Sequence, residues 1–179
     1  MGGLKALRPF RGAPLVVHAL SQARRWSDAV VVSVRDASQL AGAADAPLVV
    51  DRPDVPGPLA GLAAALDHAR AAGARLLLTI PCDMPRLPGD LPERLAASLA
   101  PDDGCALPKV EGVLQPVCGL WRPAAIDSLA AYLTAGRSSL MGFAEACGLA
   151  TVEFVGQDAE SFAGANTPEE LARLEREDP

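Results

Sequence analysis

The chain has 179 residues, of which 50% are hydrophobic and 21% charged, and its 22 acidic residues outnumber 16 basic ones to give a net charge of -6. A chain of this length buries roughly 70% of its unfolded surface, so its core needs neither disulfides nor a structural metal. An acidic chain without a basic stripe is not expected to bind nucleic acid, and any phosphate-bearing ligand must be a small molecule that meets a local site.

The sequence carries no sign of membrane insertion or secretion. No apolar run approaches the ~20 residues of a membrane span, and the opening residues MGGLKALRPFRG lack the apolar core of a secretion signal. We therefore expect a cytoplasmic protein that forms one domain over residues 1–179. The four cysteines form no CxxC pair and lie in apolar surroundings, which predicts buried free thiols rather than a zinc site: Cys82, Cys105, Cys118 and Cys147.

The first third of the chain predicts one helix and two strands. Residues 14–25 place apolar side chains on one helical stripe, with Pro14 suited to a first turn. The β-branched run 29–34 predicts a strand buried on both faces of a parallel sheet, and residues 47–50 predict a shorter one. Residues 51–58 contain three prolines and a glycine, so they form a loop of the kind that often carries function.

The middle of the chain predicts a helix, a buried strand and a second helix. Residues 59–73 form an apolar helical stripe that a glycine closes, and residues 75–80 (RLLLTI) predict the strand. The prolines that follow stop the extended structure, and Asp90 is placed to cap the next helix. Two further strands are expected around residues 104–109 and 114–121.

The last third predicts helices at 123–134 and 138–147, a strand at 151–155, and a final helix that begins at Thr167 with a capping box. This alternation indicates an α/β fold, a three-layer αβα sandwich around a mostly parallel sheet. A doubly wound domain normally opens with a strand and a phosphate-binding loop, whereas this chain opens on a loop and a helix. We therefore expect the first strand to be missing in front of Met1.

Polar side chains follow three of the predicted strands, at the sheet edge where ligands bind in open α/β folds. Asp51 follows the strand at 47–50, Asp83 follows the strand at 75–80, and Arg35 with Asp36 follows the first strand. Flanking prolines hold Asp83 rigidly. Magnesium takes one or two carboxylates and completes its shell with water and phosphates, so Asp83 is a candidate magnesium ligand. The alternative is that Asp83 only caps a turn.

Two glycine-containing segments are candidates for phosphate binding. Gly57 and Gly61 open a helix, where backbone approaches a ligand closely and the helix terminus attracts anions. Lys5, in a glycine-led loop, could hold a phosphate as a point charge, although a solvated surface lysine is the alternative. His18 and His68 lie on separate helices without partners at ligand spacing, so we interpret both as structural. The sequence contains no GxSxG elbow, full P-loop or GxGxxG motif.

Six short segments stand in order along the chain: MGGLKALRPFRGAPLV, DRPDVPGPLAG, IPCDMPRLP, LQPVCGLW, Gly136-Arg137-Ser138 and ANTPEEL. Each is common alone, whereas six in order are specific. Together they resemble the molybdenum cofactor guanylyltransferases, the MobA family of Rossmann-like nucleotidyltransferases, and the first resembles the second half of that family's LAGGxSxRMGxDKAL signature.

The resemblance implies transfer of GMP from GTP to molybdopterin with release of pyrophosphate. It implies that Asp83 holds Mg²⁺ and that Lys5 contacts phosphate as the signature lysine. It also implies that Asp51 helps to hold the nucleotide and that the Gly57 to Gly61 turn lines the pocket. Asn166, in the closing motif, is expected to be partly structural. Transient contact with molybdoenzymes would follow from delivery of the product.

The chain departs from the family in lacking the first half of the signature loop, the source of backbone amides for the triphosphate. Either the natural start lies about twenty residues earlier, or the chain is a true short form with an exposed sheet edge or a gap in its core. Cytidylyl transfer, transfer to a sugar phosphate, and a noncatalytic module that binds nucleotide or pterin are the alternatives to guanylyl transfer.

Overall fold

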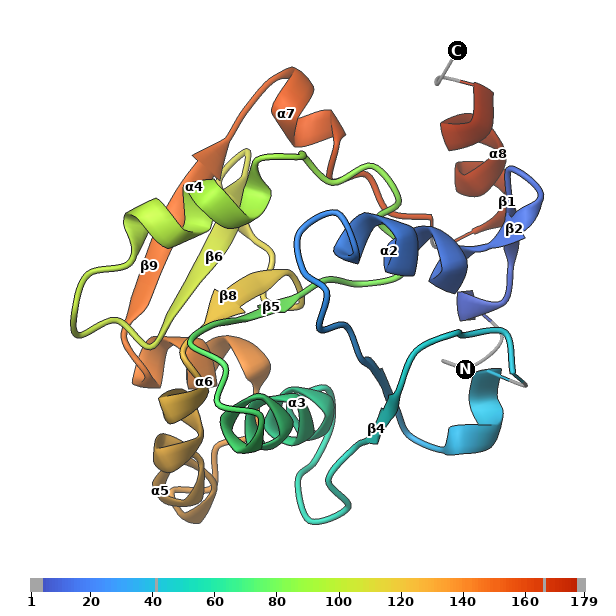
Figure 1. Ribbon diagram of the computed structural model, residues 1–179. Helices are drawn as coiled ribbons and strands as arrows, with labels where there is room; N and C mark the ends of the chain where they lie inside the picture. Colours follow the sequence, from blue (N-terminus) through green and yellow to red (C-terminus); the bar gives the residue numbers. More distant parts are fainter. Residues whose placement is uncertain (1–4, 41, 166, 177–179) are drawn as a thin grey trace.

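The computed structural model describes residues 5–40, 42–165 and 167–176 (Figure 1). Asn166 and the first four residues lie outside this described part. The elements of the first half are β1 (Pro9–Phe10), β2 (Ala13–Pro14), α2 (Leu15–Ala23), β3 (Val32–Val34), the 3₁₀-helix η1 (Ala37–Leu40), β4 (Leu48–Val50), α3 (Leu59–Ala71) and β5 (Leu77–Thr79). Those of the second half are α4 (Leu91–Ser98), β6 (Cys105–Val110), β7 (Val113–Leu114), β8 (Gly119–Trp121), η2 (Pro123–Ser128), α5 (Leu129–Thr134), α6 (Leu140–Ala146), β9 (Leu149–Phe154), α7 (Gln157–Glu160) and α8 (Pro168–Arg176).

The larger sheet has five strands with β6 at its centre. Along its whole length, from Cys105 to Val110, β6 pairs in parallel with β9. On its other edge it pairs antiparallel with β7 and β8, and β8 pairs antiparallel with β5. The sheet is therefore mixed, because the weak strands expected around residues 104–121 fold back on one another at Glu111 and Gly112.

Helices cover both faces of this sheet, which gives the three layers that the sequence predicts (Figure 1). Side chains alternate along β6, so that Cys105 and Leu107 face α3, α5 and α6, whereas Ala106 faces α4. Trp121 and Phe143 are fully buried on the first side, and their rings stack with centroids 6.2 Å apart. The fold class is the expected α/β sandwich.

The strands β3 and β4 form a separate parallel pair. In the described part of the chain, no ladder joins β3 to β5. A cavity of about 390 Å³ lies between them, and its lining includes Val16 and Leu20 of α2, Val31 next to β3 and Ile80 after β5. Both strands are shorter than predicted and incompletely buried. The strand β3 borders the cavity, whereas the chain of β5 reaches it only at Ile80, after the strand has ended. The prediction of two fully buried strands was wrong.

Most predicted helix boundaries are confirmed within a few residues, and one predicted capping interaction is wrong. At α8, the Glu170 amide donates to the Thr167 hydroxyl at 3.1 Å and the Thr167 amide donates to the Glu170 carboxylate at 3.0 Å. This reciprocal pair is the predicted capping box. Asp90 does occupy the N-cap of α4, but its side chain makes no capping hydrogen bond. Instead, Oδ1 of Asp90 lies 4.0 Å from Nη1 of Arg94.

The β1–β2 hairpin was not predicted. Its two-residue turn places Arg11 at φ 48° and Gly12 at φ 80°, the pattern of a tight hairpin turn. A cluster of buried side chains that includes Phe10 and Leu174 joins the hairpin to α8. None of the helices in the described residues has both the length and the apolar character needed to cross a bilayer.

Candidate functional site

The structure brings Lys5 and Asp83 into direct contact, although 78 positions separate them in sequence. Lys5 Nζ donates a hydrogen bond to Asp83 Oδ2 and forms an ion pair with it. Lys5 and Ala6 are helical rather than part of the loop that was predicted, and the Arg8 amide donates to the Lys5 carbonyl at 3.1 Å. Asp83 lies in the turn after β5, where the Ala165 amide donates to its carbonyl at 2.9 Å. A cation and a carboxylate thus meet beyond the end of β5, an edge strand of the five-stranded sheet.

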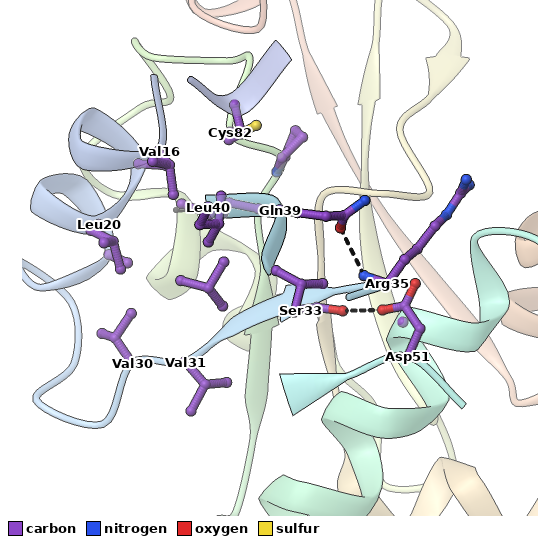
Figure 2. A pocket seen from close by; sticks show the side chains of 18 of the residues that line it. Val16, Leu20, Val30, Val31, Ser33, Arg35, Gln39, Leu40, Asp51 and Cys82 are labelled. Atoms are coloured by element: carbon purple, nitrogen blue, oxygen red, sulfur yellow. Dashed lines mark hydrogen bonds between the residues drawn. The ribbon is translucent and has the colours of Figure 1, made fainter. Parts of the chain in front are cut away.

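Asp51 follows β4 and is held against β3. The Asp51 amide donates to the Val34 carbonyl at 2.8 Å, and Ser33 Oγ donates to Asp51 Oδ1 at 2.8 Å (Figure 2). Gly61 lies in the first turn of α3 directly behind this pair. A Cβ atom at Gly61 would lie 2.8 Å from Ser33 Oγ and 3.1 Å from Asp51 Oδ1, so a side chain at this position would force the Ser33 hydroxyl to shift.

The cavity between β3 and β5 connects these two groups of residues. Its lining includes Asp51 and Gly61 together with Ala6 and Cys82, the chain neighbours of Lys5 and Asp83. Figure 2 shows Cys82 at one side of this cavity and Asp51 at another. Asp51 and Gly61 therefore line one hollow at the carboxyl ends of β3, β4 and β5, where ligands bind in open α/β sheets, and Lys5 and Asp83 adjoin it through their chain neighbours.

The remaining candidates contribute in different ways. Arg35 lines the cavity, and its amide donates to Gln39 Oε1 at 3.0 Å. Asp36 accepts from the hydroxyl and amide of Ser38, and the hydroxyl bond is the main reason that the pKa of Asp36 is lowered. Gly57 is exposed at φ 63° and is not among the residues that line the cavity.

Two polar lining residues with hydrogen bonds at the site, Ser33 and Gln39, were not predicted from the sequence. Ser33 is the one polar residue in the run AVVVSV, and its position in an otherwise β-branched strand was an available signal. Gln39 belongs to η1, a 3₁₀-helix that the sequence did not predict, so no periodic pattern pointed to it.

Residues 1–148 match the family model described as the MobA-like NTP transferase domain. The chain belongs to this family. It is 40% identical over 177 residues to a molybdenum cofactor guanylyltransferase of Cereibacter sphaeroides, an alignment covering 98% of this chain and 89% of that protein. Another protein of that name, from Cupriavidus metallidurans, is 36% identical over 185 residues, with 99% and 89% covered. The sequence resemblance is confirmed.

Solved structures agree on the MobA-like fold. Molybdopterin-guanine dinucleotide biosynthesis protein A from Archaeoglobus fulgidus superposes with a TM-score of 0.74 at 22% identity, covering 96% of this chain and 89% of that one. A 2-C-methyl-D-erythritol 4-phosphate cytidylyltransferase from Thermus thermophilus gives 0.70 at 18% identity, covering 98% and 93%. At these identities the likeness establishes the fold, and membership of the MobA-like family makes the chain a nucleotidyltransferase.

The donors around Asp83 can be compared with the needs of Mg²⁺. The described part of this MobA-like chain contains no group of three or more histidine, cysteine or acidic residues that could hold a metal by themselves. Asp83 instead offers one carboxylate with 18% of its side chain exposed. Mg²⁺ is commonly held by one or two carboxylates plus substrate phosphates, so this donor set fits a metal that arrives with a nucleotide.

The thiol beside Asp83 is not activated. Burial raises the pKa of Cys82, and the negative charge of Asp83 raises it further, while Lys5 partly opposes both. All four cysteines of the MobA-like chain are free, as predicted, but Cys82 and Cys147 are only partly buried. A protonated thiol is a poor nucleophile, so the site offers charge and position rather than a covalent intermediate.

Proposed function

We propose that this chain transfers GMP from GTP to molybdopterin and releases pyrophosphate. The names of its relatives, at 36% and 40% identity over nearly the whole chain, support this choice of substrates. The observation that carries the proposal is the contact between Lys5 and Asp83 beside the cavity. We also propose that residues 1–179 form one MobA-like domain. A cytoplasmic location and contact with molybdoenzymes remain predictions.

The proposed reaction is an in-line displacement at the α-phosphorus. An oxygen of the molybdopterin phosphate forms a bond to the α-phosphorus of GTP, the bond to the bridging oxygen breaks, and its electron pair leaves with pyrophosphate. Such a transfer needs positioning and neutralised charge more than covalent help from the protein. The rigid ends of β3, β4 and β5 are suited to hold groups around one reacting phosphate.

Each residue has a separate task in this proposal. Lys5 donates hydrogen bonds to a phosphate oxygen and offsets its growing negative charge. Asp83 would hold Mg²⁺, which supplies neutralising charge on the triphosphate when it is bound. Asp51, kept in place by Ser33, accepts hydrogen bonds from the nucleoside, and Gly61 leaves room for this contact.

The test is a measurement of pyrophosphate release by the purified chain with Mg²⁺, molybdopterin and either GTP or CTP. We expect saturable binding of GTP and release that depends on all three components, with GTP preferred over CTP. A preference for CTP would favour cytidylyl transfer. Binding of nucleotide or pterin without release would favour a noncatalytic module, and absence of both would contradict the proposal.

A further inference from the structure

The ion pair between Lys5 and Asp83 places a positive charge where a metal ion would have to bind. We propose that the Lys5 ammonium acts as a stand-in cation, occupying in the free protein the position at Asp83 where a divalent ion would bind. Asp83 then takes up a divalent ion only after a phosphate-bearing ligand has drawn the lysine away. This inference rests on the proposed function for the role of Asp83. It concerns the order in which the nucleotide and the metal enter the site.

The geometry makes the two cations mutually exclusive at one oxygen. The Lys5 ammonium is bonded to Oδ2 of Asp83, while a magnesium ion would lie about 2.1 Å from a ligating carboxylate oxygen. Both side chains are largely shielded from water, with 26% of Lys5 and 18% of Asp83 exposed. Screening is weak at such sites, so two positive charges on one carboxylate oxygen would repel each other strongly.

Of the two partners, Lys5 is the one that can move. The backbone of Asp83 is fixed by the Ala165 amide and lies between Pro81 and Pro85. Lys5 is a point charge on a flexible four-carbon stem that can swing while its backbone stays in place. A triphosphate carries more negative charge than one carboxylate and offers several acceptor oxygens, so it competes well for the ammonium.

Exchange of this kind couples the two ligands. A nucleotide that draws Lys5 toward its phosphates exposes Asp83 to the metal, and the metal on Asp83 in turn keeps Lys5 on the phosphates. Because coupling between binding sites is reciprocal, each ligand must raise the affinity for the other by the same factor. The free protein is therefore expected to bind divalent ions weakly, even though Asp83 is a suitable ligand.

The experiment measures Mn²⁺ binding to the full chain without nucleotide, from the paramagnetic resonance signal of free Mn²⁺. Lys5→Met keeps most of the length of the side chain and removes its charge. We expect it to bind one Mn²⁺ at least about fivefold more tightly than the wild type, at the lower end of ordinary coupling between sites. The gain should vanish in the Lys5→Met/Asp83→Asn double variant.

Lys109 provides a matched control, since it also pairs with a carboxylate, with its Nζ 3.6 Å from Glu153 Oε2 on the sheet. Lys109→Met should not tighten Mn²⁺ binding at Asp83. Any gain in Mn²⁺ affinity that it does produce should persist when Asp83→Asn is added. Lys5→Gln should repeat the result of Lys5→Met, and thermal melting checks that each variant is folded.

Equal or weaker Mn²⁺ binding by folded Lys5→Met and Lys5→Gln would overturn this inference, whatever the outcome with GTP. A gain in Mn²⁺ binding together with an absence of GTP binding and pyrophosphate release would leave the stand-in role intact and refute the proposed function. The two failures are therefore distinguishable.

Discussion

The hydroxyl of Ser33 donates a 2.8 Å hydrogen bond to Oδ1 of Asp51, and this bond joins the ends of two neighbouring parallel strands. Gly61 approaches both oxygen atoms from the first turn of α3. The carboxylate of Asp51 is thus oriented from two sides at the edge of the cavity. The orientation of this carboxylate depends on the Ser33 hydroxyl and on the lack of a Cβ atom at Gly61. The two contributions can be tested separately.

Removal of the hydroxyl should weaken nucleotide binding rather than the chemical step. Ser33→Ala is expected to raise the KM for GTP about fivefold to tenfold, because a hydrogen bond to a charged group is worth ~1.5 kcal/mol or less at an exposed site. The kcat should change little, and Ser33→Thr should restore most of the loss. Steady-state pyrophosphate release measures both constants. A fall in kcat at unchanged KM would contradict a positioning role for Ser33.

Addition of a methyl group at Gly61 should disturb the same hydrogen bond by crowding. The new Cβ of Gly61→Ala would lie 2.8 Å from Ser33 Oγ, closer than such atoms normally come, so the hydroxyl must turn away. We expect a KM for GTP at least as high as in Ser33→Ala. Gly89→Ala is the control, because nothing lies within 4 Å of a Cβ placed there. Unchanged kinetics in Gly61→Ala would mean that this hydrogen bond does not matter.

The sequence predicts which residues belong to this site better than it predicts the contacts between them. Asp51 and Asp83 could be predicted because a carboxylate at or just beyond the end of an apolar run marks a strand end, and strand ends gather at one edge of a sheet. The bond between Ser33 and Asp51 could not be predicted. It depends on the register of β3 against β4, which places Ser33 opposite Val49, and register is a property of two segments rather than one.

The sequence predicts a helix when its buried residues recur with the helical period. It does not predict how two elements pack against each other. All of the apolar stripe that begins at Leu59 in α3 is buried, as the period of the helix requires. The β1–β2 hairpin escaped because its turn places Arg11 at positive φ, a conformation that its residue type does not signal. The runs at 29–34 and 75–80 are as apolar as buried strands, but neither strand is fully buried, and the first borders the cavity.

Neutralisation of Asp83 should abolish metal-dependent turnover and leave the fold almost unchanged. Asp83→Asn removes the proposed magnesium ligand, so pyrophosphate release should fall at least about 100-fold, the effect expected for loss of one charge-stabilising group in a transition state. The free energy of unfolding should fall by only about 1–2 kcal/mol, because the amide that replaces the carboxylate still accepts a hydrogen bond from Lys5 although the charge pairing is lost. Urea melts and initial rates measure the two effects. Wild-type turnover would show that the metal assignment is wrong.

A side chain at Gly119 should destabilise the protein, because β8 packs tightly against β6. A Cβ there would lie 2.3 Å from Cδ2 of Leu107 and 3.2 Å from Nε1 of Trp121. Gly119→Ala is therefore expected to lower the free energy of unfolding by about 1–3 kcal/mol, the usual cost of overpacking a core. Urea denaturation measures the change, with Gly89→Ala again as the control. Equal stability of the two variants would mean that β8 can shift at no cost.

Alkaline solutions should destabilise the protein through its buried thiols. Burial raises the pKa of Cys118 from 9.0 to about 12 in the folded chain. Above pH 9 the unfolded thiol ionises while the folded one keeps its proton, so the free energy of unfolding falls by up to about 1.4 kcal/mol per pH unit for this group. Cys118→Ala should show a shallower fall between pH 9 and 11 in urea melts. If the free energies of unfolding of the wild type and Cys118→Ala differ by the same amount at every pH, the Cys118 thiol is not the origin of the pH dependence.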